Sequence, residues 1–160
     1  MVADLELRTG KDLKRIGAEL RRMNNKALKQ EFTKELRAAA RPMVPAVRQA
    51  IRQIPSKRGY SASGLRGHMS KAVKLEVRTA GRDAGVRIRV DGRKMPNRAR
   101  AVQAYMEGLK KPWRHPVYGN RENWVKQDPK PYFFKTVRPL GLASRVQVNK
   151  AIDRVAKKIS

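Results

Sequence analysis

The chain has 160 residues, which is enough for one domain with its own core and no need of a disulfide or a structural metal. Lys and Arg number 39 against 13 Asp and Glu, so the formal net charge of +26 predicts contact with nucleic acid or with acidic protein surfaces. Cysteine is absent, which excludes a disulfide framework and thiolate chemistry. No run of about 18 apolar residues occurs, so we expect no signal peptide, no membrane contact and a place in the cytosol unless lysis releases the protein.

A long amphipathic helix is predicted over residues 10–41. Apolar side chains recur there at spacings of three and four along one helical face: Leu13, Ile16, Leu20, Met23, Ala27, Leu28, Phe32, Leu36 and Ala40. The opposite face is basic and is expected to be solvated, with polyanion contact as the alternative. Pro42 and Pro45 predict the end of this helix near Arg41. A second helical segment continues to Ile54, so residues 10–54 form the expected helical region.

The next two regions are predicted to be a loop and a β-hairpin. Glycine and serine are frequent over residues 55–70, which predicts a Gly/Ser loop. From Lys71 the apolar period changes to two, in the runs that end at Val77 and at Val90. A short connection containing Gly81 joins these runs, so an antiparallel hairpin is expected within a β-sheet region of residues 71–107. Residues 101–106 fit a strand or a helix equally well.

Residues 108–131 are predicted to be a long, ordered loop rich in aromatic side chains. Its four prolines argue against regular structure, and its two tryptophans argue against plain disorder. A C-terminal helical region is expected over residues 132–159, interrupted by Pro139 and Gly141, with the last helix starting at about Ser144. Together these elements predict an α+β fold in one domain of residues 1–160, with a long N-terminal helix, an antiparallel β-hairpin or small sheet, a long aromatic loop and a C-terminal helix.

Residues suited to catalysis are sparse. The two histidines stand in no metal-ligand spacing, so no metal site, cofactor or enzymatic activity is predicted. Glu31 and Glu35 lie one helical turn apart among basic residues and are interpreted as surface charges. A magnesium-dependent nuclease that uses Asp83, Asp91 and Glu107 is a minor alternative, because the spacing of these acids demands no metal.

The aromatic loop is predicted to be a contact surface. Aromatic residues and arginine are enriched at protein–protein hot spots, and they also serve single-strand binders as stacking platforms. We favour a protein interface over packing within the domain, and packing over nucleic-acid contact, for which no residue is assigned. The expected interface residues in this loop are Trp113, Arg114, His115, Tyr118 and Trp124.

Several short segments resemble the tail-completion or head–tail joining (neck) proteins of long-tailed phages. These are Arg37-Ala38-Ala39-Ala40-Arg41-Pro42 through Ile54-Pro55, Ser63-Gly64-Leu65-Arg66, and Pro131-Tyr132-Phe133-Phe134, which is similar to a "Pro-Phe-Phe" start of the closing helix. Trp113-Arg114-His115-Pro116-Val117-Tyr118-Gly119-Asn120, with Trp124-Val125 and Gln127, is similar to a block in versions from phages of actinobacteria. The resemblance covers about residues 30–158. Met106-Glu107-Gly108-Leu109 departs from the usual "Glu-Phe-Gly-Thr".

The resemblance implies a structural, non-enzymatic virion subunit that forms a ring of six copies at the head–tail junction after assembly in the host cytoplasm. The implied partners are other copies of the chain, the capsid connector or stopper, and the tail-terminator or tail-tube proteins. It adds Tyr132, Phe133 and Phe134 to the expected interface and singles out the loop residues Gly64, Leu65 and Arg66. The positive charge then faces either adjacent rings or DNA in the lumen. Since a strongly basic lumen would retard DNA ejection, we expect mostly protein partners.

A free-standing nucleic-acid-binding protein, nucleoid-like or ribosome-associated, is the alternative function. Its main support is the net charge, and it predicts tight binding that falls steeply with salt. The two functions differ in whether a ring-sized oligomer persists at a salt concentration that screens polyanion binding.

Overall fold

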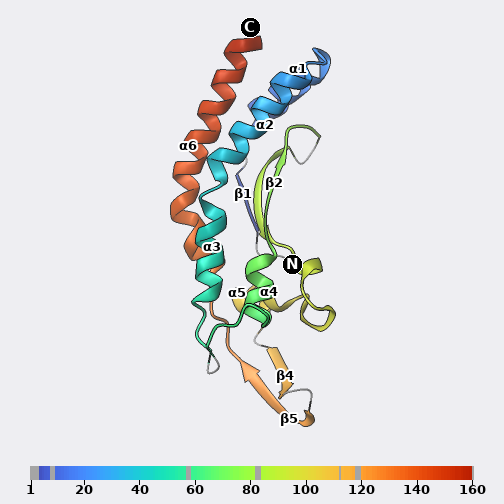
Figure 1. Ribbon diagram of the computed structural model, residues 1–160, viewed down its shortest axis with the longest axis vertical. Coiled ribbons are helices and arrows are strands. Elements are labelled where there is room, and N and C mark those ends of the chain that lie inside the picture. The colour runs from blue at the N-terminus through green and yellow to red at the C-terminus, as the bar shows by residue number, and fades with distance from the viewer. Residues whose placement is uncertain are drawn as a thin grey trace.

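A computed structural model gives the structure of the chain over residues 4–7, 10–56, 59–81, 84–111, 113–117 and 120–159. The fold is α+β, as predicted, and the molecule is elongated (Figure 1). Its elements in chain order are β1 (Asp4–Leu7), α1 (Gly10–Arg22), α2 (Lys26–Ala40), α3 (Met43–Arg52), α4 (Leu65–Lys71), β2 (Val73–Arg78), β3 (Gly85–Val90), the 3-10 helices η1 (Gly92–Lys94) and η2 (Asn97–Ala99), α5 (Val102–Glu107), β4 (Trp113–Val117), β5 (Asn120–Gln127) and α6 (Phe133–Ile159).

Two layers make up the body of the molecule. Helices α2 and α3 follow one another along the long axis beside α6, and a small sheet lies against them (Figure 1). Apolar side chains of α2, α6 and β3 meet between the layers, among them Phe32, Leu36, Val148 and Ile88, all of which are buried. None of the helices in the described ranges has both the length and the apolar character that crossing a membrane requires.

The sheet has three antiparallel strands in the order β1-β3-β2. The predicted β2–β3 hairpin is confirmed, with Leu75 opposite Ile88 and Val77 opposite Val86. Strand β1 was not predicted, because four residues are too few to establish a period and its partner β3 lies about 80 residues away. The expected sheet region of residues 71–107 is also shorter than predicted, since η1, η2 and α5 follow β3. Residues 101–106, which fitted either element, are largely helical.

The predicted helix over residues 10–41 is wrong in one respect, because it is two helices. Asn24 adopts a left-handed conformation with φ of 50°, and the Asn25 side chain accepts a hydrogen bond from the Leu28 backbone N–H at 2.9 Å. Asparagine tolerates the left-handed region and is a strong N-cap, so the pair ends α1 and starts α2. The predicted apolar stripe is interrupted at this break, where Met23 and Ala27 are exposed, and it is buried again from Leu28 because both helices pack on α6. The predicted end near Arg41 and the second helical segment are confirmed.

The Gly/Ser loop is shorter than the predicted range of 55–70. Helix α4 begins at Leu65, directly after the N-cap residue Gly64. Gly67 lies inside this helix rather than in a turn, and a Cβ added to it would stand 2.0 Å from the carbonyl oxygen of Ala62. Glycine at this position therefore permits a close approach between two backbone segments. In the sequence, a glycine needed for such packing looks the same as a glycine of a loop.

The prediction of an irregular loop over residues 108–131 is wrong, because β4 and β5 form an antiparallel hairpin there. Pro116 is accommodated beside a register shift between Pro116 and Val117, and Pro129 and Pro131 fall outside the strands. A two-stranded ribbon has free outer edges, where a residue without a backbone donor removes no ladder hydrogen bond. The prolines in this segment are therefore compatible with the strands β4 and β5.

The predicted interruption of the C-terminal helix is also wrong. Helix α6 runs without a break from Phe133 to Ile159 with Pro139 inside it. Its apolar stripe, including Val137, Val148 and Val155, is buried on both sides of the proline. Packing of this stripe against α2 and α3 outweighs the hydrogen bond that proline removes.

Candidate binding surfaces

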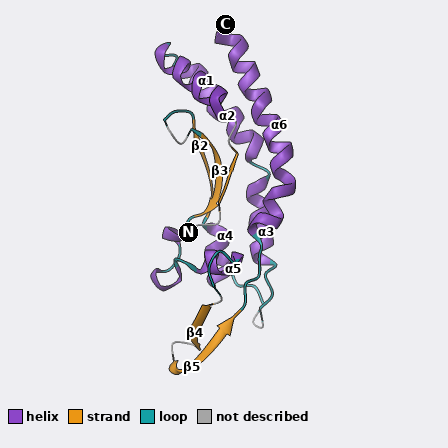
Figure 2. Ribbon diagram, turned by 180° about the vertical axis from the view of Figure 1, so that it is seen from behind, coloured by secondary structure: helices purple, strands orange, loops and turns teal. Residues whose placement is uncertain are grey.

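The β4–β5 hairpin projects from the end of the molecule opposite the C-terminus (Figures 1 and 2). Seven consecutive residues of β5, from Asn120 to Lys126, are exposed. Trp124 and Val125 are 50% and 42% exposed, and as neighbours in a strand their side chains point to opposite faces of the hairpin. Both faces of the hairpin therefore offer apolar surface to a partner.

The hairpin is held to the body mainly at its base. His115 and Gln127 form a hydrogen bond between Nε2 and Oε1 at 3.1 Å, and the Gln127 side-chain amide donates to Sδ of Met106 at 3.3 Å. The Trp124 indole N–H donates to the carbonyl oxygen of Arg121 at 2.6 Å. Since the polar edge of the indole is satisfied within the hairpin, its exposed part is the apolar ring.

The structure separates the predicted interface residues into two groups. Trp113, Arg114 and His115 lie on β4 and Trp124 on β5, so these belong to the hairpin, whereas Tyr118 lies outside the described residues. The other three predicted residues, Tyr132, Phe133 and Phe134, lie at the start of α6.

Tyr132 and Phe133 are buried in the core, so the structure corrects their assignment to an interface, whereas Phe134 is half-buried and its interface role stays a prediction. Phe133 packs edge to face against both neighbours, with ring centroids 6.4 Å from Tyr132 and 5.4 Å from Phe134. The Tyr132 hydroxyl is buried without a hydrogen-bond partner among the described residues. Burial and the nearby charge of Glu107 raise the pKa of Tyr132 far above its usual value.

Glu107 holds the start of α6 in place from α5. Its Oε2 accepts hydrogen bonds from the backbone N–H groups of Tyr132 at 2.8 Å and Phe133 at 2.7 Å, and its Oε1 accepts from Phe134 at 2.9 Å. The carboxylate is buried, with only 7% of the residue exposed. The role of Glu107 is therefore that of a helix cap supplied from 25 residues away in the chain, and sequence analysis missed it because N-caps are sought next to the helix they serve.

The Gly64-Leu65-Arg66 segment has a structural role at the end of α3. Nη1 of Arg66 donates to the carbonyl oxygen of Ile54 at 2.6 Å, and the Tyr60 ring lies 5.8 Å from the Arg66 guanidinium carbon. An arginine there satisfies a carbonyl beyond the last turn of a helix, where the dipole also favours positive charge. Gly64 starts α4 and Leu65 is exposed, beside a pocket of about 500 Å³.

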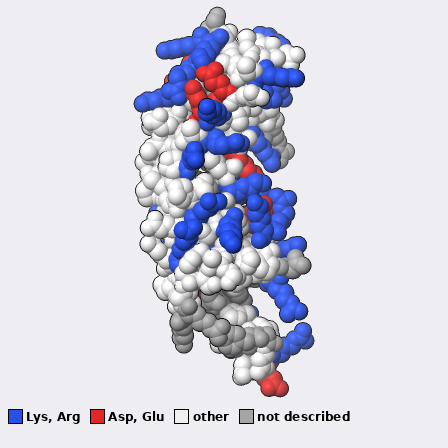
Figure 3. All heavy atoms as spheres, in the orientation of Figure 1, with Lys and Arg blue, Asp and Glu red and all other residues white. Residues whose placement is uncertain are grey.

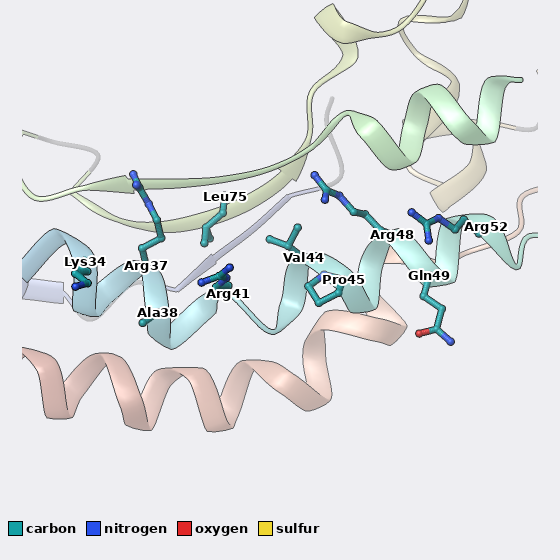
Figure 4. Close-up of a pocket in the computed structure, with 10 residues that line it drawn as sticks. All are labelled: Lys34, Arg37, Ala38, Arg41, Val44, Pro45, Arg48, Gln49, Arg52 and Leu75. Atoms are coloured by element: carbon teal, nitrogen blue, oxygen red, sulfur yellow. The ribbon is translucent and has the colours of Figure 1, made fainter. Parts of the chain in front are cut away.

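A second candidate surface is a basic groove that sequence analysis did not identify. It has a volume of about 790 Å³ and lies between α2, α3 and the edge strand β2. Figure 4 shows Leu75 reaching from the sheet toward the junction of the two helices, with Arg37 and Arg48 on either side of it. The residues that line it are Lys34, Arg37, Ala38, Arg41, Val44, Pro45, Arg48, Gln49, Arg52 and Leu75.

The basic groove continues along α2. A hollow of about 510 Å³ adjoins it and shares Lys34 and Arg37 with it, and it adds Lys26 and Lys29 to the lining. Space-filling atoms show Lys and Arg side chains spread over the middle of the molecule, with far fewer acidic ones among them (Figure 3). We call the two hollows together the α2–α3 groove. The sequence signal that could have revealed it is a recurrence of cations from residue 26 to residue 52, mostly at spacings of three, four and seven.

The acidic side chains of α2 point away from the groove. Glu35 forms an ion pair with Arg154 of α6 at 3.0 Å, and Glu31 forms one with Lys158. These acids are surface charges, as predicted, and both are paired with cations of α6. Because Glu31 and Glu35 are paired with α6, the groove face of α2 carries cations and no acid.

The outer face of the sheet carries a separate charge network. Arg89 bonds Glu76 at 2.8 Å, and Arg93 bonds Asp91 at 3.2 Å. The hydrogen bond from the Arg93 side chain holds the pKa of Asp91 below its usual value, and Asp91 in turn raises the pKa of Arg93. Burial raises the pKa of Glu76, but hydrogen bonds from Lys74 and Arg89 outweigh it, so the pKa is lowered.

These contacts bear on the minor nuclease alternative. Asp91 is held by arginines and Glu107 by backbone N–H groups, while Asp83 lies outside the described residues. Within the part of the chain that the structure describes, no three His, Cys, Asp or Glu side chains lie close enough together to hold a metal ion.

Comparisons with protein families, curated proteins and solved structures found no match to this chain.

Proposed function

We propose that this chain is a structural subunit of a phage virion, and that copies of it close into a ring at the head–tail junction. The observation that carries the proposal is the projecting β4–β5 hairpin, which exposes Trp124 and Val125 on opposite faces. A two-stranded hairpin alone is marginally stable in water, and an aromatic side chain exposed at its centre is typical of a protein–protein anchor. Such an arm gains stability by docking on a neighbour.

The order of elements also supports this proposal. Long N-terminal helices, a Gly-Leu-Arg segment, an antiparallel hairpin and a closing helix that starts at Tyr132-Phe133 follow one another as the resemblance to head–tail joining proteins implies. Glu107, which stands in the segment that departs from the usual motif, still joins that segment to the start of the closing helix. The two short motifs are thus parts of one structural unit.

The geometry of the arm favours a ring over a two-fold dimer. The hairpin lies at one end of the elongated molecule, opposite the end where α1 and the C-terminus of α6 lie. An arm at the end that contacts a different surface on the next subunit makes a heterologous interface, and such interfaces close into rings when the rotation between subunits allows it. The capsid connector and the tail-terminator protein are the proposed neighbours of that ring.

The test is the mass of the purified protein by light scattering in about 0.5 M NaCl, which screens binding to stray polyanions. We expect a ring-sized oligomer, and negative-stain images with six-fold symmetry. The double variant Trp124→Ser/Val125→Ser should be monomeric, whereas the control Leu142→Ser/Val146→Ser, which removes as much exposed apolar surface from α6, should keep the oligomer.

Two outcomes would contradict the proposal in different ways. A wild-type protein that is monomeric at this salt concentration would show that the chain does not assemble by itself. Loss of the oligomer in the α6 variant alone would place the interface on α6 and remove the hairpin as its anchor.

A further inference from the structure

All the charged residues that line the α2–α3 groove are cations. Seven line it: Lys26, Lys29, Lys34, Arg37, Arg41, Arg48 and Arg52. None of the seven forms an ion pair with an acid anywhere in the described ranges, and none of the residues that line the two hollows is acidic. So many cations held together without compensation repel one another, and this repulsion is relieved when an anion binds.

Arg48 brings a buried donor to the groove. Its Nε is buried and has no hydrogen-bond partner among the described residues. A buried charged donor without an acceptor is costly, and it is satisfied when an oxyanion enters beside it. Figure 4 shows the Arg48 side chain directed from α3 toward the sheet, into the space that Leu75 also faces.

The arrangement of these cations matches an extended polyanion. Helices α2 and α3 together hold 25 residues and follow one another along the long axis, so the cationic line is about 40 Å long at 1.5 Å per residue. This length is about one turn of duplex DNA, and a basic stripe along a helix is the electrostatic signature of nucleic-acid binding. We propose that the α2–α3 groove binds the phosphate backbone of double-stranded DNA, a function beyond ring assembly.

Duplex DNA fits this surface better than an acidic protein partner does. From the sequence we expected mostly protein partners, because a strongly basic lumen would retard DNA ejection. The structure gathers seven cations in one line free of acids, and DNA presents phosphates at regular intervals along such a line.

The experiment measures binding of a fluorescein-labelled 24-base-pair DNA duplex of mixed sequence by anisotropy, from about 50 to 300 mM NaCl. If all seven cations reach phosphates, log K should fall with log salt with a slope of about −6, since each contact contributes about −0.9. The variant Arg37→Gln/Arg41→Gln/Arg48→Gln should weaken binding at least tenfold at about 100 mM salt and reduce the slope by about three. Replacing the same three residues with lysine should restore both.

A matched control separates the groove from the charge of the whole protein. Arg21→Gln/Arg98→Gln/Arg138→Gln removes three exposed arginines from α1, η2 and α6, so both triple variants have a net charge of +26 − 3 = +23. The control should keep the wild-type slope. Equal slopes for the two triple variants, or no binding by the wild type at 50 mM salt, would overturn the proposal. A competition experiment gives a further test, in which poly-L-glutamate and unlabelled duplex are added at equal total charge. If poly-L-glutamate displaces the labelled duplex as well as the unlabelled duplex does, the proposal is overturned and the groove is assigned to an acidic protein.

Discussion

At the scale of single residues, Glu107 shows how one buried acid joins two distant segments. Its carboxylate accepts three backbone hydrogen bonds from residues 132–134, at the start of α6. The first N–H groups of a helix have no acceptor within it, and the positive end of the helix dipole attracts a negative charge. Glu107 meets both needs and at the same time anchors α5 to the long helix.

We expect Glu107→Gln to lower the free energy of unfolding by about 2–3 kcal/mol, because the amide loses the charge and turns a donor toward buried N–H groups. Urea unfolding followed by circular dichroism at pH 7 measures the change. As a control, Glu122→Gln on the exposed strand β5 should change the free energy of unfolding by less than about 0.5 kcal/mol. Equal effects of the two substitutions would show that the Glu107 cap adds no stability.

At the scale of elements, α6 contains a defect that its packing tolerates. Pro139 lies in the second turn and removes the N–H that would bond the carbonyl oxygen of Lys135. The stripe of buried residues continues past it, so the core facing α2 and α3 outweighs the local cost.

Replacing this proline should therefore stabilise the protein. We expect Pro139→Ala to raise the free energy of unfolding by about 1–2 kcal/mol, because the helix gains a hydrogen bond worth more than the added freedom of the unfolded chain. Thermal and urea unfolding measure it, with Leu142→Ala at an exposed site nearby as the neutral comparison. A less stable Pro139→Ala protein would mean that α6 needs a bend at this position to pack on α3.

At the scale of the whole molecule, the net charge of +26 opposes folding as well as guiding binding. Like charges on a compact body repel, and salt screens that repulsion more than it weakens the few ion pairs between α2 and α6. The folded state should gain stability as salt is added.

We expect the melting temperature to rise by several degrees between about 20 mM and 0.5 M NaCl, which corresponds to about 1–2 kcal/mol for a domain of this size. Differential scanning calorimetry measures it. Both triple arginine variants should show a smaller rise than the wild type, and the groove variant should show the smaller rise of the two, because its three cations lie close together. A melting temperature that falls with salt would show that the ion pairs outweigh the repulsion.

The sequence by itself determined the elements that are specified by a pattern of a few neighbouring residues. The apolar stripe of α2, the prolines that end it, and the alternation in β2 and β3 each lie within a few residues of the structure they specify, and each was confirmed. The α+β class followed from these elements. Where the prediction failed, a local signal such as proline in α6 or in the hairpin was outweighed by packing or by free strand edges.

The candidate sites depend on contacts that no local pattern carries. The aromatic side chains of residues 108–131 predicted a contact surface on an irregular loop, but only tertiary structure formed a hairpin there, placed Tyr132 and Phe133 in the core and left Trp124 exposed. The α2–α3 groove exists because strand β2, which begins 21 residues after the end of α3, lies beside the two helices, and because α6 takes their acids into ion pairs. Composition determined how much positive charge this protein carries, and the fold decided where it gathers, since charge placement is a property of the folded surface.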